Sequence, residues 1–185
     1  MRHLIFALLA LFATTSLASA SDLTPPEKRS AIADFALKNI KGKKVKLSEL
    51  KGKVVIINFW ATWCGPCKQE LPFLDQYQKD LKDKGLEVLA ISIDSPQTLS
   101  EVRVLAKRKR WKMNVLLDQD GSTLAALNPR GTPPFTVGVD REGRIAFQHE
   151  GYASGDEVEI KKHIDTLIAE GADAAPTPAP AAPTP

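Results

Sequence analysis

Two cysteines that directly follow a continuous apolar segment limit the folds open to this chain. The segment over residues 54–60 reads VVIINFW, which is typical of a central strand buried on both faces. Cys64 and Cys67 come next, at the start of a segment with helical spacing. A buried strand that leads into Cys-x-x-Cys at a helix start is suited to forming and breaking a disulfide.

A bond between Cys64 and Cys67, the only cysteines of the 185 residues, is better suited to exchange than to passive stapling. A bridge across so short a loop removes little entropy from the unfolded chain, so it adds little stability. Strain in such a bridge also makes it comparatively reducible. The spacing therefore favours a redox or metal-binding role over a structural disulfide.

The N-terminus predicts export. Arg2 and His3 precede an apolar stretch, and residues 18–20 (ASA) form a small-residue cleavage pattern. The stretch is shorter than the roughly 20 residues that cross a bilayer, so we expect a cleavable signal peptide over residues 1–20 rather than an uncleaved membrane anchor. The expected location is the periplasm or another exported compartment.

The remaining chain is divided by composition. Residues 171–185 alternate Pro with Ala and Thr, which predicts a disordered tail. Residues 21–32 form a lead-in segment, and residues 33–170 are enough for one domain with a single core. The formal net charge of +3 gives no indication of nucleic-acid binding.

Periodicity predicts an α/β fold with a mixed sheet. Short alternating segments over residues 34–37 and 44–47 indicate an N-terminal hairpin, and residues 86–93 indicate a second buried strand. Helices are expected from Cys64 to about Gly85, after Ser95, over residues 122–127 and around residues 158–168. Residues 135–139 and 144–147 read as an antiparallel pair.

A helix that begins near Cys64 makes the two sulfurs unequal. Unpaired backbone N–H groups and the positive end of the helix dipole favour the Cys64 thiolate, so Cys64 is the expected nucleophile. Cys67 lies one turn further on, is expected to be more shielded from solvent than Cys64, and is the expected resolving thiol. Gly65 and Pro66 shape the turn between them, and Trp63 is expected to cover one flank. Trp60 is expected in the core, and a wall of the site is the alternative.

The segment NFWATWCGPCKQELP over residues 58–72 resembles the active-site segment of thioredoxin-fold proteins, and most closely the exported TlpA/ResA-like thiol-disulfide oxidoreductases. The segments GKVV at residues 52–55 and GTPPFTVGVD at residues 131–140 also match family landmarks. The resemblance covers residues 33–170. It implies a thioredoxin fold, in which helices flank a central mixed β-sheet, here with an N-terminal hairpin extension.

The resemblance also implies site residues. Counting back from Asp140 places a cis proline at Pro134, or at Pro133 if the register slips by one residue. Asn58 stands where cytoplasmic thioredoxins carry a buried Asp, and Glu70 matches an acidic residue that relays the proton of Cys67. The alternative for Glu70 is an ordinary exposed helix position. The implied substrate-binding residues are Trp63, Gly65, Pro66, Thr132, Pro133 and Pro134.

Other interpretations remain open. Two thiolates alone can hold Cu(I), so a copper-handling protein is the alternative from a different class, although no His or Met lies beside the pair in sequence. A peroxidase is disfavoured, because Thr62 is too close to Cys64 to match the peroxidase pattern. The basic run at residues 107–112 is expected to be a solvated face, and an acidic partner or anionic lipid is the alternative.

The sequence therefore predicts a monomeric, exported thiol-disulfide oxidoreductase that uses Cys64, Cys67 and Glu70. It is expected to reduce, or alternatively to oxidise, disulfides in exported proteins. Apocytochrome c and proteins with copper-site cysteines are substrates that the resemblance suggests. No cofactor and no metal are expected, and a membrane protein is the expected source of electrons.

Overall fold

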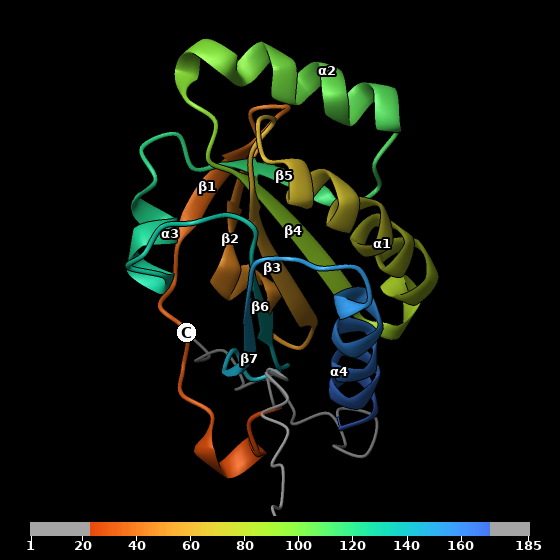
Figure 1. The fold of residues 1–185 in the computed structure, drawn as a ribbon. Coiled ribbons are helices and arrows are strands. Elements are labelled where there is room, and N and C mark those ends of the chain that lie inside the picture. The colour runs from red at the N-terminus through yellow and green to blue at the C-terminus, as the bar shows by residue number, and fades with distance from the viewer. Residues whose placement is uncertain (1–22, 171–185) are drawn as a thin grey trace, which may run out of the picture.

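A seven-stranded mixed sheet forms the centre of the computed structural model, which describes residues 23–170 (Figure 1). The strand order across the sheet is β2-β1-β5-β4-β3-β6-β7. Strands β3, β4 and β5 are parallel, and all other neighbours are antiparallel. The strands are β1 (Ala36–Asn39), β2 (Lys44–Lys46), β3 (Val54–Trp60), β4 (Leu86–Ser92), β5 (Asn114–Leu117), β6 (Phe135–Val139) and β7 (Ile145–Glu150). The predicted α/β architecture with an N-terminal hairpin is confirmed.

Four α-helices cover the two faces of the sheet, and α1 and α4 lie together on the side opposite α3 (Figure 1). The helices are α1 (Gly65–Leu81), α2 (Leu99–Lys109), α3 (Ser122–Leu127) and α4 (Asp156–Glu170). Four short 3-10 helices complete the described elements: η1 (Pro26–Lys28), η2 (Leu47–Leu50), η3 (Lys82–Lys84) and η4 (Pro96–Thr98). The expected helices therefore form, although a 3-10 turn precedes α2.

Strand β3 joins the two halves of the core. All seven of its residues are buried, as the apolar run predicts. Val54, Ile56 and Trp60 pack with α1, α2 and α4, whereas Ile57 and Phe59 pack with α3 on the other face. The period of two along a strand decides this division, and it directs Asn58 toward the α1 side. Trp60 is a core residue, as expected.

The closing helix α4 differs from the expectation at one position. Ile160, Ile164 and Leu167 are buried against the sheet, but Val158 is 66% exposed. A separation of two residues on a helix turns the side chain to nearly the opposite side, so Val158 cannot share the face of Ile160. The apolar face therefore begins at Ile160, two residues later than the sequence predicts.

The lead-in segment is tied to the end of the sheet in its described part. The Thr24 N–H donates to the Ala146 carbonyl oxygen at 2.7 Å. Arg29, which is buried, pairs with Asp140 at 3.3 Å and with Glu170 at 2.6 Å. These contacts link the segment to the turn after β6 and to the end of α4.

Residues 1–22 and 171–185 lie outside the described residues, and so do the predicted signal peptide over residues 1–20 and the predicted tail over residues 171–185. Within residues 23–170, none of the helices combines the length and the apolar character that crossing a membrane requires.

Candidate active site

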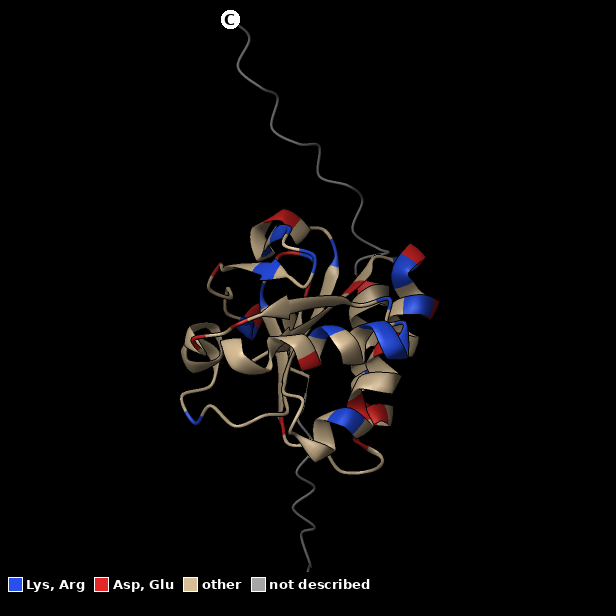
Figure 2. Cartoon of the chain, turned by 90° about the horizontal axis from the view of Figure 1, so that it is seen from above, with Lys and Arg blue, Asp and Glu red and all other residues tan. Residues whose placement is uncertain are grey.

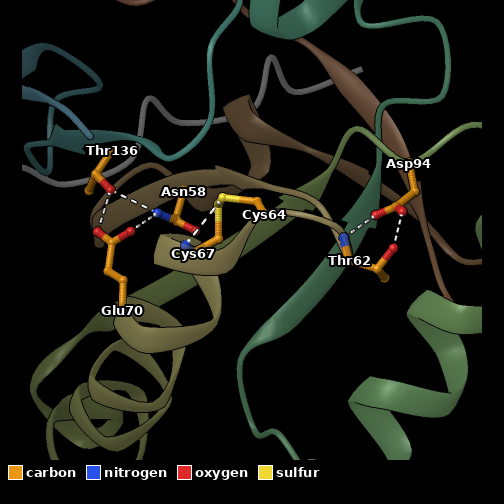
Figure 3. The surroundings of a disulfide bond; sticks show 7 residues. All are labelled: Asn58, Thr62, Cys64, Cys67, Glu70, Asp94 and Thr136. Atoms are coloured by element: carbon orange, nitrogen blue, oxygen red, sulfur yellow. Dashed lines mark hydrogen bonds between the residues drawn. A yellow bond between two sulfur atoms is a disulfide. The ribbon is translucent and has the colours of Figure 1, made fainter. Parts of the chain in front are cut away.

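Cys64 and Cys67 form a disulfide at the first turn of α1 (Figure 3). Their Cα atoms are 5.3 Å apart. Cys64 is the N-cap residue of the helix, and the Cys67 N–H donates to the Cys64 Sγ at 3.2 Å. This contact directs a helix N-terminal donor at the sulfur that the sequence identifies as the nucleophile.

The two sulfurs differ in access, but less than the sequence analysis expects. Cys64 is 5% exposed and Cys67 is fully buried. The next residues of the turn, Gly65 and Pro66, are exposed, and the Trp63 side chain is 65% exposed. An attacking thiol must therefore approach Cys64 along the surface that these three residues form.

Glu70 is fully buried one turn beyond Cys67, so it is not an ordinary surface position. Its Oε2 accepts a hydrogen bond from the Asn58 Nδ2 at 2.9 Å, and its Oε1 accepts one from the Thr136 Oγ1 at 2.8 Å. The same Asn58 nitrogen donates to Thr136 at 2.8 Å. Strands β3 and β6 thus hold the carboxyl group of α1 from two sides (Figure 3).

Burial raises the pKa of Glu70 to about 7, because an ionised carboxylate loses its hydration there. Three smaller effects, the hydrogen bonds from Thr136 and Asn58 and the charge of His149, act in the opposite direction. His149 lies opposite Thr136 in the β6–β7 pairing and contacts Asp156 at 3.0 Å. A carboxyl group with this pKa can both release and accept a proton near neutral pH.

The loop before Cys64 is held by an aspartate that the sequence analysis did not identify. Asp94 is buried and accepts a hydrogen bond from the Thr62 N–H at 2.9 Å. It also accepts bonds from the hydroxyl groups of Thr62, Ser92 and Thr98. Thr62 points toward Asp94 and away from the disulfide (Figure 3). The position of Asp94, just after a buried strand that neighbours β3, was the signal that could have identified it.

The peptide bond between Pro133 and Pro134 is cis, which is the register counted back from Asp140. Pro134 directly precedes β6, whose Phe135 pairs with Phe59 near the end of β3. The proline is therefore at the same end of the sheet as the cysteines. Pro134 is buried, Pro133 is half-buried and Thr132 is exposed.

Metal-binding geometry is not found around the disulfide in the described part of the chain. Residues 23–170 contain no group of three or more His, Cys, Asp or Glu side chains arranged to hold a metal ion. His149 pairs with Asp156, and the His163 ring packs against Phe147. The fold therefore brings neither histidine to the cysteines as a ligand.

Known proteins are similar to this chain in sequence and in fold. Thiol-disulfide oxidoreductase ResA of Geobacillus kaustophilus is 30% identical over 138 residues, which cover 75% of this chain and 76% of the relative. The crystal structure of a Chlorobium tepidum protein assigned as thiol:disulfide interchange protein DsbE is 31% identical, with a TM-score of 0.69 over 76% of this chain and 96% of that one. The pneumococcal exposed lipoprotein thioredoxin of Streptococcus pneumoniae is 30% identical, with a TM-score of 0.61 over 73% of this chain and 100% of that one.

The fold and the Cys-x-x-Cys disulfide define a thiol-disulfide oxidoreductase of the ResA and DsbE type, with a thioredoxin-like fold. A model of the AhpC/TSA family matches residues 29–148. The chain therefore belongs to the AhpC/TSA family.

Proposed function

We propose that the protein reduces disulfides of other exported proteins by exchange through Cys64 and Cys67. The observation that carries the proposal is the Cys64–Cys67 disulfide at the N-terminus of α1, one turn before the buried carboxyl group of Glu70. This arrangement supplies a thiolate-stabilising helix end, a second thiol and a proton acceptor.

The first step uses the reduced form of the pair. The Cys64 thiolate, stabilised by the Cys67 N–H, attacks one sulfur of a substrate disulfide. A mixed disulfide forms, the substrate bond breaks, and the departing substrate thiolate takes up a proton. The surface around Trp63, Gly65, Pro66, Thr132, Pro133 and Pro134 is the proposed docking site for the substrate.

The second step uses the buried thiol. Cys67 transfers its proton toward Glu70, and the resulting thiolate attacks the Cys64 sulfur. The Cys64–Cys67 disulfide forms, and the second substrate thiolate leaves. Two electrons have passed from the protein to the substrate, and the protein reaches the disulfide form that the structure contains.

Two observations support an exported location, where the protein would need an outside source of electrons. One relative is described as an exposed lipoprotein thioredoxin, and residues 1–20 are predicted to be a signal peptide. A thiol-disulfide reductant in the membrane would regenerate the dithiol. Apocytochrome c and proteins with copper-site cysteines are the proposed substrates, because their cysteines must be reduced before they bind their ligands.

A trapping experiment tests the proposed roles of the two cysteines. Cys67→Ser should accumulate a mixed disulfide with its substrate, because the resolving thiol is missing, and mass spectrometry would identify the trapped protein. Cys64→Ser is the matched control and should trap none. Equal trapping by both variants would contradict the assignment of the nucleophile.

The direction of electron flow is tested by equilibrating the protein with glutathione buffers. A reductase requires a reduction potential well below that of strong oxidants of the same fold. A measured value near about −120 mV would overturn the reductase assignment and favour an oxidase.

A further inference from the structure

The amide of Asn58 has one oxygen without a partner, and this oxygen lies next to the redox pair. Asn58 is fully buried, and its Oδ1 has no hydrogen-bond partner within residues 23–170. A buried carbonyl oxygen without a donor is destabilising. The oxidised structure therefore contains an unfilled acceptor at its active site.

The orientation of this amide follows from its neighbours. The Nδ2 group donates to both Glu70 and Thr136, and a flipped amide would place an oxygen against the carboxyl group. The Oδ1 must therefore face away from Glu70. Figure 3 shows the Asn58 side chain between Glu70 and the disulfide, with its oxygen on the cysteine side.

The donor that is missing in the oxidised protein appears on reduction. A disulfide sulfur carries no proton, whereas cleavage of the Cys64–Cys67 bond by two electrons and two protons yields two thiols, and a thiol is a weak donor. Cys67 is fully buried, so its S–H has no access to solvent. It needs an acceptor within the protein.

We propose that Asn58 is a positioning residue whose side-chain oxygen accepts a hydrogen bond from the Cys67 thiol in the reduced protein. The bond exists only after reduction, so it stabilises the dithiol relative to the disulfide. Through Nδ2, the same side chain holds Glu70 beside that thiol. The inference rests on the cycling of Cys64 and Cys67 in the proposed function, but it does not depend on which protein is the substrate.

Infrared spectroscopy tests the bond directly. In a Cys64→Ser background Cys67 is the sole thiol of the chain, and its S–H stretching band shifts to lower frequency when hydrogen-bonded. Asn58→Ala should move the band to higher frequency. Thr136→Val keeps the Asn58 side chain and should leave the band unchanged. An identical band in Asn58→Ala would overturn the proposal.

The exchange equilibrium supplies a second readout in protein with both cysteines. At pH 6, where Glu70 is mostly protonated, Asn58→Ala should shift the equilibrium with glutathione about fivefold toward the disulfide, or about 20 mV. Thr136→Val removes the other hydrogen bond to Glu70 and is the matched control, with no expected shift. Equal shifts in both variants would show that Asn58 acts only by holding Glu70. Failure to find a substrate would leave both readouts intact.

A separate observation concerns a basic cleft away from the disulfide. A cleft of about 1100 Å³ lies between the ends of α1 and α2, the end of β1 and the start of β5. Glu87 is the one acidic residue among those that line it in the described chain, and Glu87 pairs with Lys53 at 3.1 Å. In Figure 2, several blue Lys and Arg segments lie on the helices at the right of the view.

Five cations line this cleft without a partner. Their side chains form no hydrogen bond or ion pair within residues 23–170, and all five are exposed: Lys41, Lys82, Lys107, Arg110 and Lys112. They come from the β1–β2 turn, the end of α1, and α2 with the segment after it. A concave site lined by one sign of charge concentrates the potential and attracts ligands of opposite charge.

The size of the cleft and the positions of its cations favour an extended ligand. Its volume is slightly above the usual range for small-molecule sites, and its cations come from three separate segments. An extended peptide, which advances about 3.3 Å per residue, can present successive carboxylates to them. Lys82 lies fifteen residues after Cys67, about 22 Å along the helix axis, so a ligand here leaves the disulfide accessible.

We propose that this basic cleft binds an acidic peptide segment of a partner protein. The test uses a fluorescein-labelled peptide of seven glutamates, with binding followed by fluorescence anisotropy in 150 mM NaCl at about physiological ionic strength. Lys82→Glu combined with Lys107→Glu should weaken binding about tenfold or more. Lys51→Glu combined with Lys162→Glu changes the net charge equally outside the cleft and should have little effect.

Any of the following outcomes would overturn the proposal that the cleft binds an acidic peptide. Equal weakening by both double variants would indicate non-specific attraction, and absence of peptide binding would exclude the site. Tighter binding to vesicles containing phosphatidylglycerol, or to pyrophosphate, would assign the cleft to a membrane surface or to a small phosphate. Lys82→Gln with Lys107→Gln provides a milder test if the double reversal fails to fold.

Discussion

Two buried carboxyl groups on α1 have opposite surroundings. Asp75 is 2% exposed, pairs with Lys79 at 2.6 Å and accepts the backbone N–H groups of Lys112 and Met113. Glu70, one and a half turns earlier, is fully buried and receives only a side-chain amide and a hydroxyl. Among the described residues, no cation pairs with it.

The difference shows how one helix places two acidic residues in two roles. The negative charge of Asp75 is compensated, so this residue fastens α1 to the segment that leads into β5. Glu70 has no paired cation among the described residues, so burial favours its protonated form and raises its pKa to about 7. The contacts of Asp75 are structural, whereas a proton acceptor must change its charge. The predictions below test this division.

The largest effect on stability is expected at Asp75. Asp75→Ala leaves Lys79 without its partner and two backbone N–H groups without their acceptor. We expect the free energy of unfolding, measured in urea, to fall by about 3 to 4 kcal/mol. Asp75→Asn keeps an acceptor oxygen and should lose less. A loss below about 1 kcal/mol in Asp75→Ala would contradict the structural role.

Glu70→Gln should change the free energy of unfolding in the opposite direction and stabilise the protein at high pH. Glu70 titrates near 4.5 when unfolded and near 7 when folded, so ionisation favours the unfolded chain as pH rises between these values. At pH 4 the variant and the wild type should be equally stable. At pH 8 the variant should be more stable by up to about 3 kcal/mol. Urea unfolding of the oxidised proteins at both pH values measures this difference.

The same variant should slow exchange, because Cys67 loses its proton acceptor. The alkylation rate of the reduced protein as a function of pH should therefore change in Glu70→Gln. Asp75→Asn is the matched control on the same helix and should leave the profile unchanged. An unaltered profile in Glu70→Gln would leave Glu70 without a role in the chemistry.

Thr136→Val should have a smaller effect. It removes one hydrogen bond to the Glu70 carboxyl group, which raises the pKa of Glu70 further and costs about 1 kcal/mol of stability at pH 8. Carbon-13 NMR of the Glu70 carboxyl group follows the titration directly. Thr123→Val, at a buried position on α3, should leave the titration in place.

The smallest effect is expected at His149. Its charge lowers the pKa of Glu70, so His149→Gln should raise that pKa by less than about half a unit, or about 0.7 kcal/mol. Asp156 acts in the opposite direction, so Asp156→Asn should lower the pKa of Glu70. Shifts of the same sign in both variants would contradict this account of the electrostatics.

The sequence predicts the parts of the fold whose cause is local. The buried run at residues 54–60, the hairpin before it and the helix after Cys64 follow from hydrophobic period and turn residues, and the structure has them. Trp60 is in the core for the same reason. Val158 was placed on the wrong face, because an apolar residue at a helix start resembles a continuation of the buried stripe.

The surroundings of the site depend on contacts distant in sequence. Glu70 meets Thr136 across 66 residues, and Asp94 meets Thr62 across 32. Asp75 and Asn58 Oδ1 acquire their roles only when strands and helices come together, and no local pattern marks them. Glu70 was identified through the family resemblance alone, since its propensity equally suits a solvent-exposed helix position.

The Asp94 contacts have a consequence for the motion that accompanies electron transfer. The bonds from Thr62 to Asp94 hold the backbone that enters the Cys64 turn, and none of them involves a cysteine atom. We therefore expect the reorganisation between the two redox states to be confined to side-chain rotation at the cysteines. Crystals of the oxidised protein should then tolerate reduction in place, with the lattice and the main chain unchanged.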